Sequence, residues 1–195
     1  GARAATRALF RPRTLALACT GGALQLALVS SVFTWLPSFL HRNYGLAPDV
    51  AGVRTGFVVL VGGAGAIVWS LVADLLTPAH PRARMHVSAL TAAASAVLFG
   101  AAFALIEPGP AQIALIVAGA FTMTGTIGPV AAVVIDVAPP ALRATAASVL
   151  ALVQNLAGLA AGPLVVGMLS DRHGLPFALA VMPACCVLAA AVFTS

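Results

Sequence analysis

Six long runs of apolar residues, separated by short segments rich in proline and polar residues, divide the chain. The hydrocarbon core of a bilayer is about 30 Å thick and requires about 20 apolar residues of helix, and each run is about that long. The runs are continuous, whereas the strands of a membrane barrel alternate apolar and polar positions. The pattern therefore predicts an all-α membrane protein, with a six-helix transmembrane bundle in residues 14–195, over about 15–40, 50–76, 87–106, 111–137, 142–169 and 175–193.

The composition agrees with lipid as the main solvent. Hydrophobic residues make up 61% of the 195 residues and charged residues 8%, against roughly half and a quarter in soluble domains. Ten arginines and five acidic residues cannot cover a soluble core of this size. The net charge of +5 does not indicate nucleic-acid binding, because the arginines lie between apolar runs and no aromatic and basic surface accompanies them. The lipid bilayer is the expected partner.

The arginines are divided unevenly between the two sides of the membrane that six antiparallel helices define. With the amino terminus in the cytoplasm, seven lie inside and three outside, which satisfies the positive-inside rule. Residues 1–13 then form a cytoplasmic basic linker, and both ends of the chain are cytoplasmic. The first residue is Gly1 and the first apolar run is too long for a signal-peptide core, so we expect an excerpt of a longer chain or a processed one. The inner arginines are Arg3, Arg7, Arg11, Arg13, Arg82, Arg84 and Arg143, and the outer ones are Arg42, Arg54 and Arg172.

Small residues follow one face of the second and of the fifth predicted helix. Helix association in lipid depends on close backbone approach, which small residues at four- and seven-residue spacing allow. We therefore expect both helices to meet partners closely, and packing alone explains these glycines without a ligand. The expected packing residues are Gly52, Gly56 and Gly63 in the second helix, and Gly158, Gly162, Pro163 and Gly167 in the fifth.

Polar side chains gather in the first, second, fourth and fifth helices, which predicts an interior polar face. The third and sixth helices carry little that is strongly polar, so we expect them on the lipid-facing flank. The candidates to line a substrate cavity are Gln25, Arg54, Thr124, Gln154 and Asn155. Two alternatives stay open: Arg54 reaches the interface along its apolar stem, and each of the three amides bonds a neighbouring helix.

The sequence carries no catalytic constellation. The four histidines are scattered through the connections, and the three cysteines lie inside apolar runs without a CxxC spacing, so no metal site is expected. No serine, cysteine or histidine shares a helix face with a suitable base, and no glycine-rich phosphate loop occurs. We expect no enzyme activity and no cofactor.

Four short passages follow one another in a recognisable order. The first helix ends in FTWLPSFL (33–40), followed by YGL (44–46) and AG (51–52). The second ends in SLVAD (70–74), followed by Arg82 and Arg84. VAPPALRATA (137–146) precedes the fifth helix, and GLAAGPLVVGMLSD (158–171) closes it. In this order on six spans, the passages resemble the carboxy-terminal half of a major facilitator superfamily transporter, and the last two are most similar to its Spinster-type branch and related bacterial organic-solute carriers.

This resemblance implies one half of a twelve-helix major facilitator fold, with a missing amino-terminal six-helix half as its partner. Such a carrier is a secondary active transporter that binds a small-molecule substrate, an organic solute or amphiphile, between the halves and moves it by alternating access. A bacterial inner membrane is the implied location. The alternative is a membrane scaffold or partner subunit that transports nothing itself.

The resemblance also assigns a gate or loop motif. Its residues are Asp74, Arg82, Arg84 and Arg143, and Asp136 is grouped with them from its place near a hydrated helix end, as a gate or structural group rather than a proton carrier. Asp74 ends a helix, where the dipole disfavours a carboxylate, and the resemblance places its cationic partner largely in the other half. Asp136 and Arg143 lie on either side of a proline pair, which favours a local ion pair between them.

Overall fold

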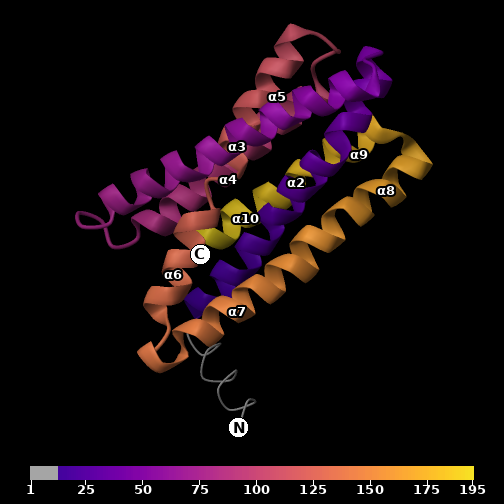
Figure 1. Ribbon diagram of the computed structural model, residues 1–195. Helices are drawn as coiled ribbons and strands as arrows, with labels where there is room; N and C mark the ends of the chain where they lie inside the picture. The colour runs from indigo at the N-terminus through magenta and orange to yellow at the C-terminus, as the bar shows by residue number, and fades with distance from the viewer. Residues whose placement is uncertain (1–12) are drawn as a thin grey trace.

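The computed structural model describes residues 13–195, and in this part of the chain all regular structure is helical (Figure 1). The predicted basic linker, residues 1–13, lies outside the described residues except for Arg13, which begins the first helix. The elements in chain order are α2 (Arg13–Tyr44), α3 (Pro48–Leu76), α4 (Ala83–Ala104), α5 (Pro110–Met123), α6 (Ile127–Val137), η1 (Pro140–Leu142), α7 (Arg143–Val153), η2 (Gln154–Ala160), α8 (Ala161–His173), α9 (Leu175–Val181) and α10 (Pro183–Thr194).

The six predicted spans are confirmed. Within residues 13–195, six segments are long and apolar enough to cross a membrane: α2, α3 and α4 each form one, α5 with α6 forms the fourth, η1 to α8 the fifth, and α9 with α10 the sixth. Prolines at the first turn begin α3, α5 and α10, where the missing N–H has no helical partner to lose. Gly45 and Gly174 make two of the turns with φ of 63° and 86°, a left-handed conformation that glycine adopts without strain.

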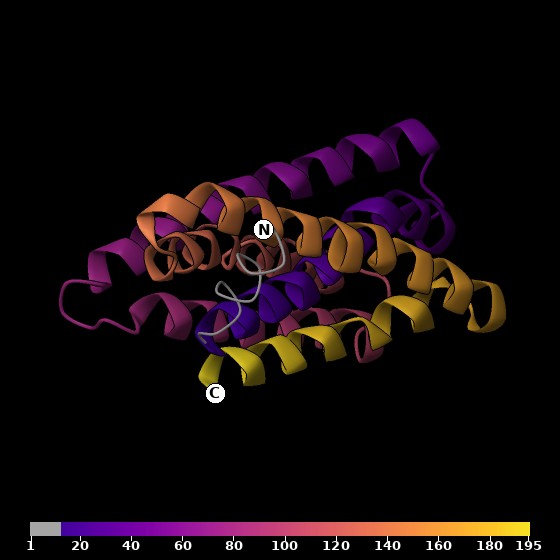
Figure 2. The same ribbon diagram turned by 90° about the horizontal axis from the view of Figure 1, so that it is seen from below.

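Consecutive spans run antiparallel, so the connections gather at two ends of the bundle. Tyr44, the last residue of α2, donates its hydroxyl to the carbonyl of Gly109, which directly precedes α5, and these residues mark what we call the outer end. The basic end holds the start of α2, the α3–α4 connection and the ends of α6 and α10. Figure 2 shows α10 beside the start of α2 from below. Arg13, Arg82, Arg84 and Arg143 share the basic end, as the arginine pattern requires.

The helices are buried very unequally. In the most apolar 18-residue stretch of α2, 72% is buried, whereas only 22% is buried in the corresponding stretches of α3 and of the fifth span. The third predicted helix has one exposed apolar face, with Leu90 and Val97 of α4 60% and 70% exposed, whereas Ser88, Thr91 and Ser95 on its other face are completely buried. Their hydroxyls donate to carbonyls one turn back on the same helix, at 2.7 Å for Ser95 to Thr91, so the helix needs no outside partner to bury them.

The glycine stripe of α3 is not a packing face within this chain. A Cβ added at Gly52, Gly56 or Gly63 would meet no atom of the described residues within 4 Å. The close contacts come from Gly62 and Gly65 instead, and a Cβ at Gly65 would overlap the carbonyl of Phe121 in α5. Glycines stand on both sides of this helix, and spacing alone does not tell which side meets a neighbour.

The glycine face of the fifth span does pack, as the sequence predicts. A Cβ at Gly158 would lie 2.8 Å from the carbonyl oxygen of Ala23, and one at Gly162 would lie 2.8 Å from the hydroxyls of Ser30 and Ser31 in α2. The indole of Trp35 donates to the Pro163 carbonyl at 3.0 Å and packs beside Gly167. This contact holds the fifth span against the central α2.

Candidate functional site

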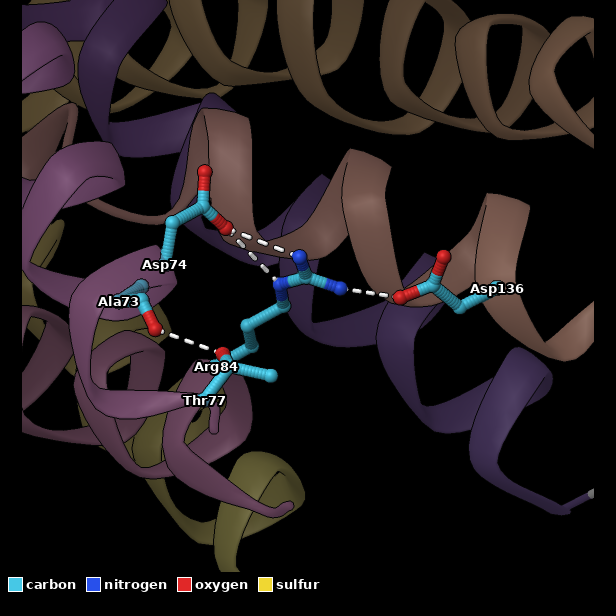
Figure 3. A network of polar contacts seen from close by, with 5 residues as sticks. All are labelled: Ala73, Asp74, Thr77, Arg84 and Asp136. Atoms are coloured by element: carbon cyan, nitrogen blue, oxygen red, sulfur yellow. Dashed lines mark hydrogen bonds and ion pairs between the residues drawn. The ribbon is translucent and has the colours of Figure 1, made fainter. Parts of the chain in front are cut away.

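One arginine joins three helix ends at the basic end (Figure 3). Arg84, in the first turn of α4, donates from Nε and Nη2 to Asp74 Oδ1 of α3 at 3.1 and 2.9 Å. Its Nη1 donates to Asp136 Oδ2 of α6. Thr77 closes the end of α3 beside the triad through a 2.7 Å bond to the Ala73 carbonyl. The motif residues Asp74, Arg84 and Asp136 are therefore brought together, and α3, α4 and α6 are linked at one point.

The partners within this triad differ from those expected. Asp74 has a cationic partner within its own half, Arg84, and Asp136 pairs with Arg84 rather than Arg143. The antiparallel order places the ends of α3 and α6 beside the start of α4, whereas Arg143 follows the proline pair at the start of α7. Among the described residues, neither Arg82 nor Arg143 makes an ion pair.

Each charged group of the triad lies at the unfavourable end of its own helix, and the ion pairs offset this. A carboxylate at a helix carboxyl end and a guanidinium at an amino end each face the unfavourable pole of the helix dipole. Pairing them removes both penalties. Because Asp74 and Asp136 are 59% and 61% exposed, water screens the pairs, and each contributes at most about 1 kcal/mol. A contact this weak and this exposed can be broken and remade.

The fourth span is broken at residues 124–126, so the prediction of one continuous helix over 111–137 is wrong there. Gly125 and Ile127 donate their N–H groups three residues back, to the carbonyls of Thr122 and Thr124. Pro129 has no N–H to offer Gly125, and its ring disfavours a regular turn before it. The carbonyls of Phe121 and Met123 thereby lose the donors that a regular α-helix would give them.

Two side chains from neighbouring helices satisfy these carbonyls. Trp69 of α3 donates its indole N–H to the Phe121 carbonyl at 3.1 Å, and Gln25 of α2 donates its amide to the Met123 carbonyl at 2.9 Å. The Thr124 hydroxyl also donates to the Gly62 carbonyl at 2.6 Å. Together the three bonds fix the break against α2 and α3. Broken helices buried in protein are common in transporters, where they lie near the substrate.

These contacts place two of the cavity candidates inside the bundle. Gln25 is 1% exposed and Thr124 is 4% exposed, so neither reaches an open face of this half. The Gln25 Nε2 also lies 3.5 Å from the Ser95 hydroxyl. The Gln25 Oε1 has no hydrogen-bond partner among the described residues. Both residues bond across helices, which is the alternative that the sequence left open for Gln25.

Arg54 borders a cavity at the outer end. The cavity has a volume of about 290 Å³ and lies between α2, α3 and α5. Arg54 is its one charged residue; apolar side chains make the rest of its wall, namely Leu36, Leu40, Val53, Phe57, Val58, Ile113, Ile116 and Val117. Among the described residues no carboxylate pairs with Arg54. An apolar slot with one guanidinium suits a ligand that has an anionic group and a hydrocarbon part.

Gln154 and Asn155 begin a π-helical segment, η2, in the middle of the fifth span. Such segments occur often at functional sites. Asn155 is exposed and donates to the Ala151 carbonyl at 2.7 Å. Gln154 is half-buried and packs beside Gly22 of α2. The two amides and Arg54 are the candidates that the structure leaves at the surface of this half.

Sequence reasoning missed the role of Trp69 and Trp35. Both are tryptophans inside apolar spans, and a buried indole N–H needs an acceptor. That requirement was the available signal, but it names no acceptor. The structure supplies the Phe121 carbonyl for Trp69 and the Pro163 carbonyl for Trp35.

Comparisons with known proteins agree with this architecture. Two solved structures of a bacterial homolog to the human lysosomal transporter Spinster, both inward-facing, match the chain at 19% identity. The unoccupied one has a TM-score of 0.83 over 99% of this chain and 49% of its own; the occupied one has 0.82 over 93% and 48%. This chain thus spans about half the length of the structures it matches, and its fold is that of one six-helix half. No curated protein sequence matches it. The family model of the Major Facilitator Superfamily matches residues 1–162, which is most of the sequence, and the chain therefore belongs to the Major Facilitator Superfamily.

Proposed function

We propose that this chain is the carboxy-terminal half of a secondary active transporter, which moves a small organic solute or amphiphile by alternating access together with a complementary six-helix half. The observation that carries the proposal is the unpartnered face of α3. Gly52, Gly56 and Gly63 lie exposed along a helix whose other side is closely packed. Small residues in a row favour close approach of a second helix in lipid, and the matched transporter structures are twice as long as this chain.

The Arg54 cavity is the proposed contact for the substrate. Arg54 is exposed at the border of this cavity, and an arginine inside a membrane span costs a few kcal/mol unless it reaches the interface or meets water or an anion. An amphiphile with an anionic group would place that group at Arg54 and its hydrocarbon part against Leu36 and Phe57. Gln154 and Asn155, from the exposed fifth span, are the proposed polar contacts nearer the middle of the membrane.

The Arg84 triad is the proposed gate. It links the basic ends of α3, α4 and α6 by exposed ion pairs, so a rocking motion that separates these ends would break it at small cost. Because both carboxylates lie at hydrated helix ends, we expect them to act in gating rather than to carry protons. Asp136→Asn should then change the rate of exchange and leave any proton coupling intact.

The test is uptake by proteoliposomes that contain the chain together with its complementary half. The probe is a fluorescent lysophospholipid with an anionic headgroup, compared with a zwitterionic one of the same chain length. We expect saturable uptake of the anionic probe, which Arg54→Ala lowers and Arg54→Lys largely retains. Arg42→Ala, which removes an arginine from the same end but outside the cavity, is the matched control.

Two outcomes would contradict the proposal in different ways. If folded protein with both halves moves neither probe nor any other solute, the scaffold alternative gains. If uptake is robust but Arg54→Ala and Arg42→Ala behave alike, transport stands and the assignment of the Arg54 cavity is wrong.

A further inference from the structure

A second cavity lies at the basic end, far from Arg54. It has a volume of about 400 Å³ and is enclosed by the start of α2, the α3–α4 connection, the end of α6 and the end of α10. Its lining combines arginines and a histidine with apolar side chains. The residues that carry the argument are Arg13, Arg82, His86, Leu17, Val133 and Phe193.

The cavity has an excess of positive charge that the described residues do not neutralise. Its one lining carboxylate, Asp136, is already bound to Arg84, which Asp74 holds from the other side. No carboxylate of the described residues lies within ion-pair distance of Arg13 or Arg82. An anion is therefore the ligand that Arg13 and Arg82 favour.

The apolar lining residues of the cavity favour a ligand with a hydrocarbon part over a small, fully hydrated anion. Leu17 of α2, Val133 of α6 and Phe193 of α10 present hydrocarbon to the same space. Each of these helices belongs to a membrane span. A ligand with a phosphate at the arginines and an acyl chain along the helices would use both kinds of lining residue.

We propose that this cavity binds an anionic phospholipid, with the headgroup phosphate at Arg13 and Arg82 and the start of an acyl chain against Leu17, Val133 and Phe193. Basic pockets between membrane helices bind anionic lipid headgroups by this combination of charge and shape. The site is independent of the substrate contact at Arg54, because the two cavities lie at opposite ends of the bundle and share no residue.

Native mass spectrometry of the purified chain in a neutral detergent tests the proposal. The probes are phosphatidylglycerol and phosphatidylcholine with the same acyl chains, and inorganic phosphate. We expect phosphatidylglycerol to bind at least tenfold more tightly than phosphatidylcholine. Arg13→Gln with Arg82→Gln should weaken it about 30-fold, taking about 1 kcal/mol for each cation and 1.4 kcal/mol for each factor of ten.

The control pair is Arg42→Gln with Arg172→Gln, which removes the same charge from the outer end and should leave the affinity within about threefold. Leu17→Trp enlarges one apolar lining residue while the arginines stay, and should also weaken binding of phosphatidylglycerol. Equal affinities for the two lipids, or equal losses in both double variants, would overturn the proposal. Displacement of the lipid by millimolar inorganic phosphate would assign the site to a soluble anion instead. If the double variant does not fold, the preference of the unchanged chain between the two lipids decides.

Discussion

Replacing Gly65 by alanine should separate α3 from α5 and loosen the break in the fourth span. The added Cβ would overlap the Phe121 carbonyl and lie 2.7 Å from its carbon, whereas ordinary carbon contacts begin at about 3.5 Å. The helices must therefore move apart by about 1 Å. That shift also stretches the bonds from Trp69 to Phe121 and from Thr124 to Gly62.

The expected loss of stability is about 2 to 4 kcal/mol. Overpacking at a backbone contact costs about 1–3 kcal/mol, and two interhelical hydrogen bonds in a membrane protein add about 0.6 kcal/mol each. The matched control is Gly63→Ala, two residues away on the same helix, where the new methyl group meets none of the described residues. Because alanine is the better helix former, this control should be neutral or slightly stabilising in the isolated half.

The assay is unfolding of the purified chain in mixed micelles, with helix content followed by circular dichroism as the denaturing detergent is raised. Gly65→Ala should unfold at a clearly lower fraction of that detergent than Gly63→Ala. Equal midpoints for the two variants would refute the reasoning, since they would mean that the α3–α5 contact does not depend on a bare backbone at residue 65.

Three further changes can be read in the same unfolding assay. Arg84→Gln breaks both ion pairs and should cost at most about 2 kcal/mol, because both pairs are exposed; a loss above 3 kcal/mol would show that the triad is not screened. Arg143→Gln, which breaks no ion pair of the described residues, is its control. Gln25→Leu leaves the Met123 carbonyl without its donor and should cost about 1–3 kcal/mol. Removal of Oε1, which has no partner among the described residues, reduces this cost. Unchanged stability would contradict the view that Gln25 stabilises the break in the fourth span. Gly45→Ala forces an alanine into a left-handed turn with φ of 63° and should cost about 1 kcal/mol, whereas a neutral result would mean that the turn adjusts freely.

The sequence was sufficient for the features that depend on local length and polarity. Each of the six spans is an uninterrupted apolar run, and lipid requires that such a run be helical whatever its neighbours are. The arginines at the basic end could also be assigned, because short connections force antiparallel order. The spacing of Gly158 and Gly162 predicted close packing on a neighbouring helix, and the structure shows that this helix is α2.

The break at residues 124–126 could be predicted only in part from the sequence. Gly125, Gly128 and Pro129 were visible as helix-breaking residues, but helices in membranes often continue through such residues when neighbours satisfy the freed carbonyls. Whether Trp69 and Gln25 stand at the right positions to bond Phe121 and Met123 depends on how α2 and α3 pack on α5.

Only the tertiary structure decided which face of each helix turns inward. In water an apolar stripe marks the buried side of a helix, but here hydrocarbon surrounds the bundle and both sides of α3 are apolar. Nothing local therefore separates Gly62 and Gly65, which pack on α5, from Gly52, Gly56 and Gly63, which do not. The choice of Arg84 as the partner of Asp74 and Asp136 has the same origin, since it depends on which helix ends meet in space. The sequence determined that six helices cross the membrane and in what order, and the packing of those helices determined their rotation and the contacts between their polar groups.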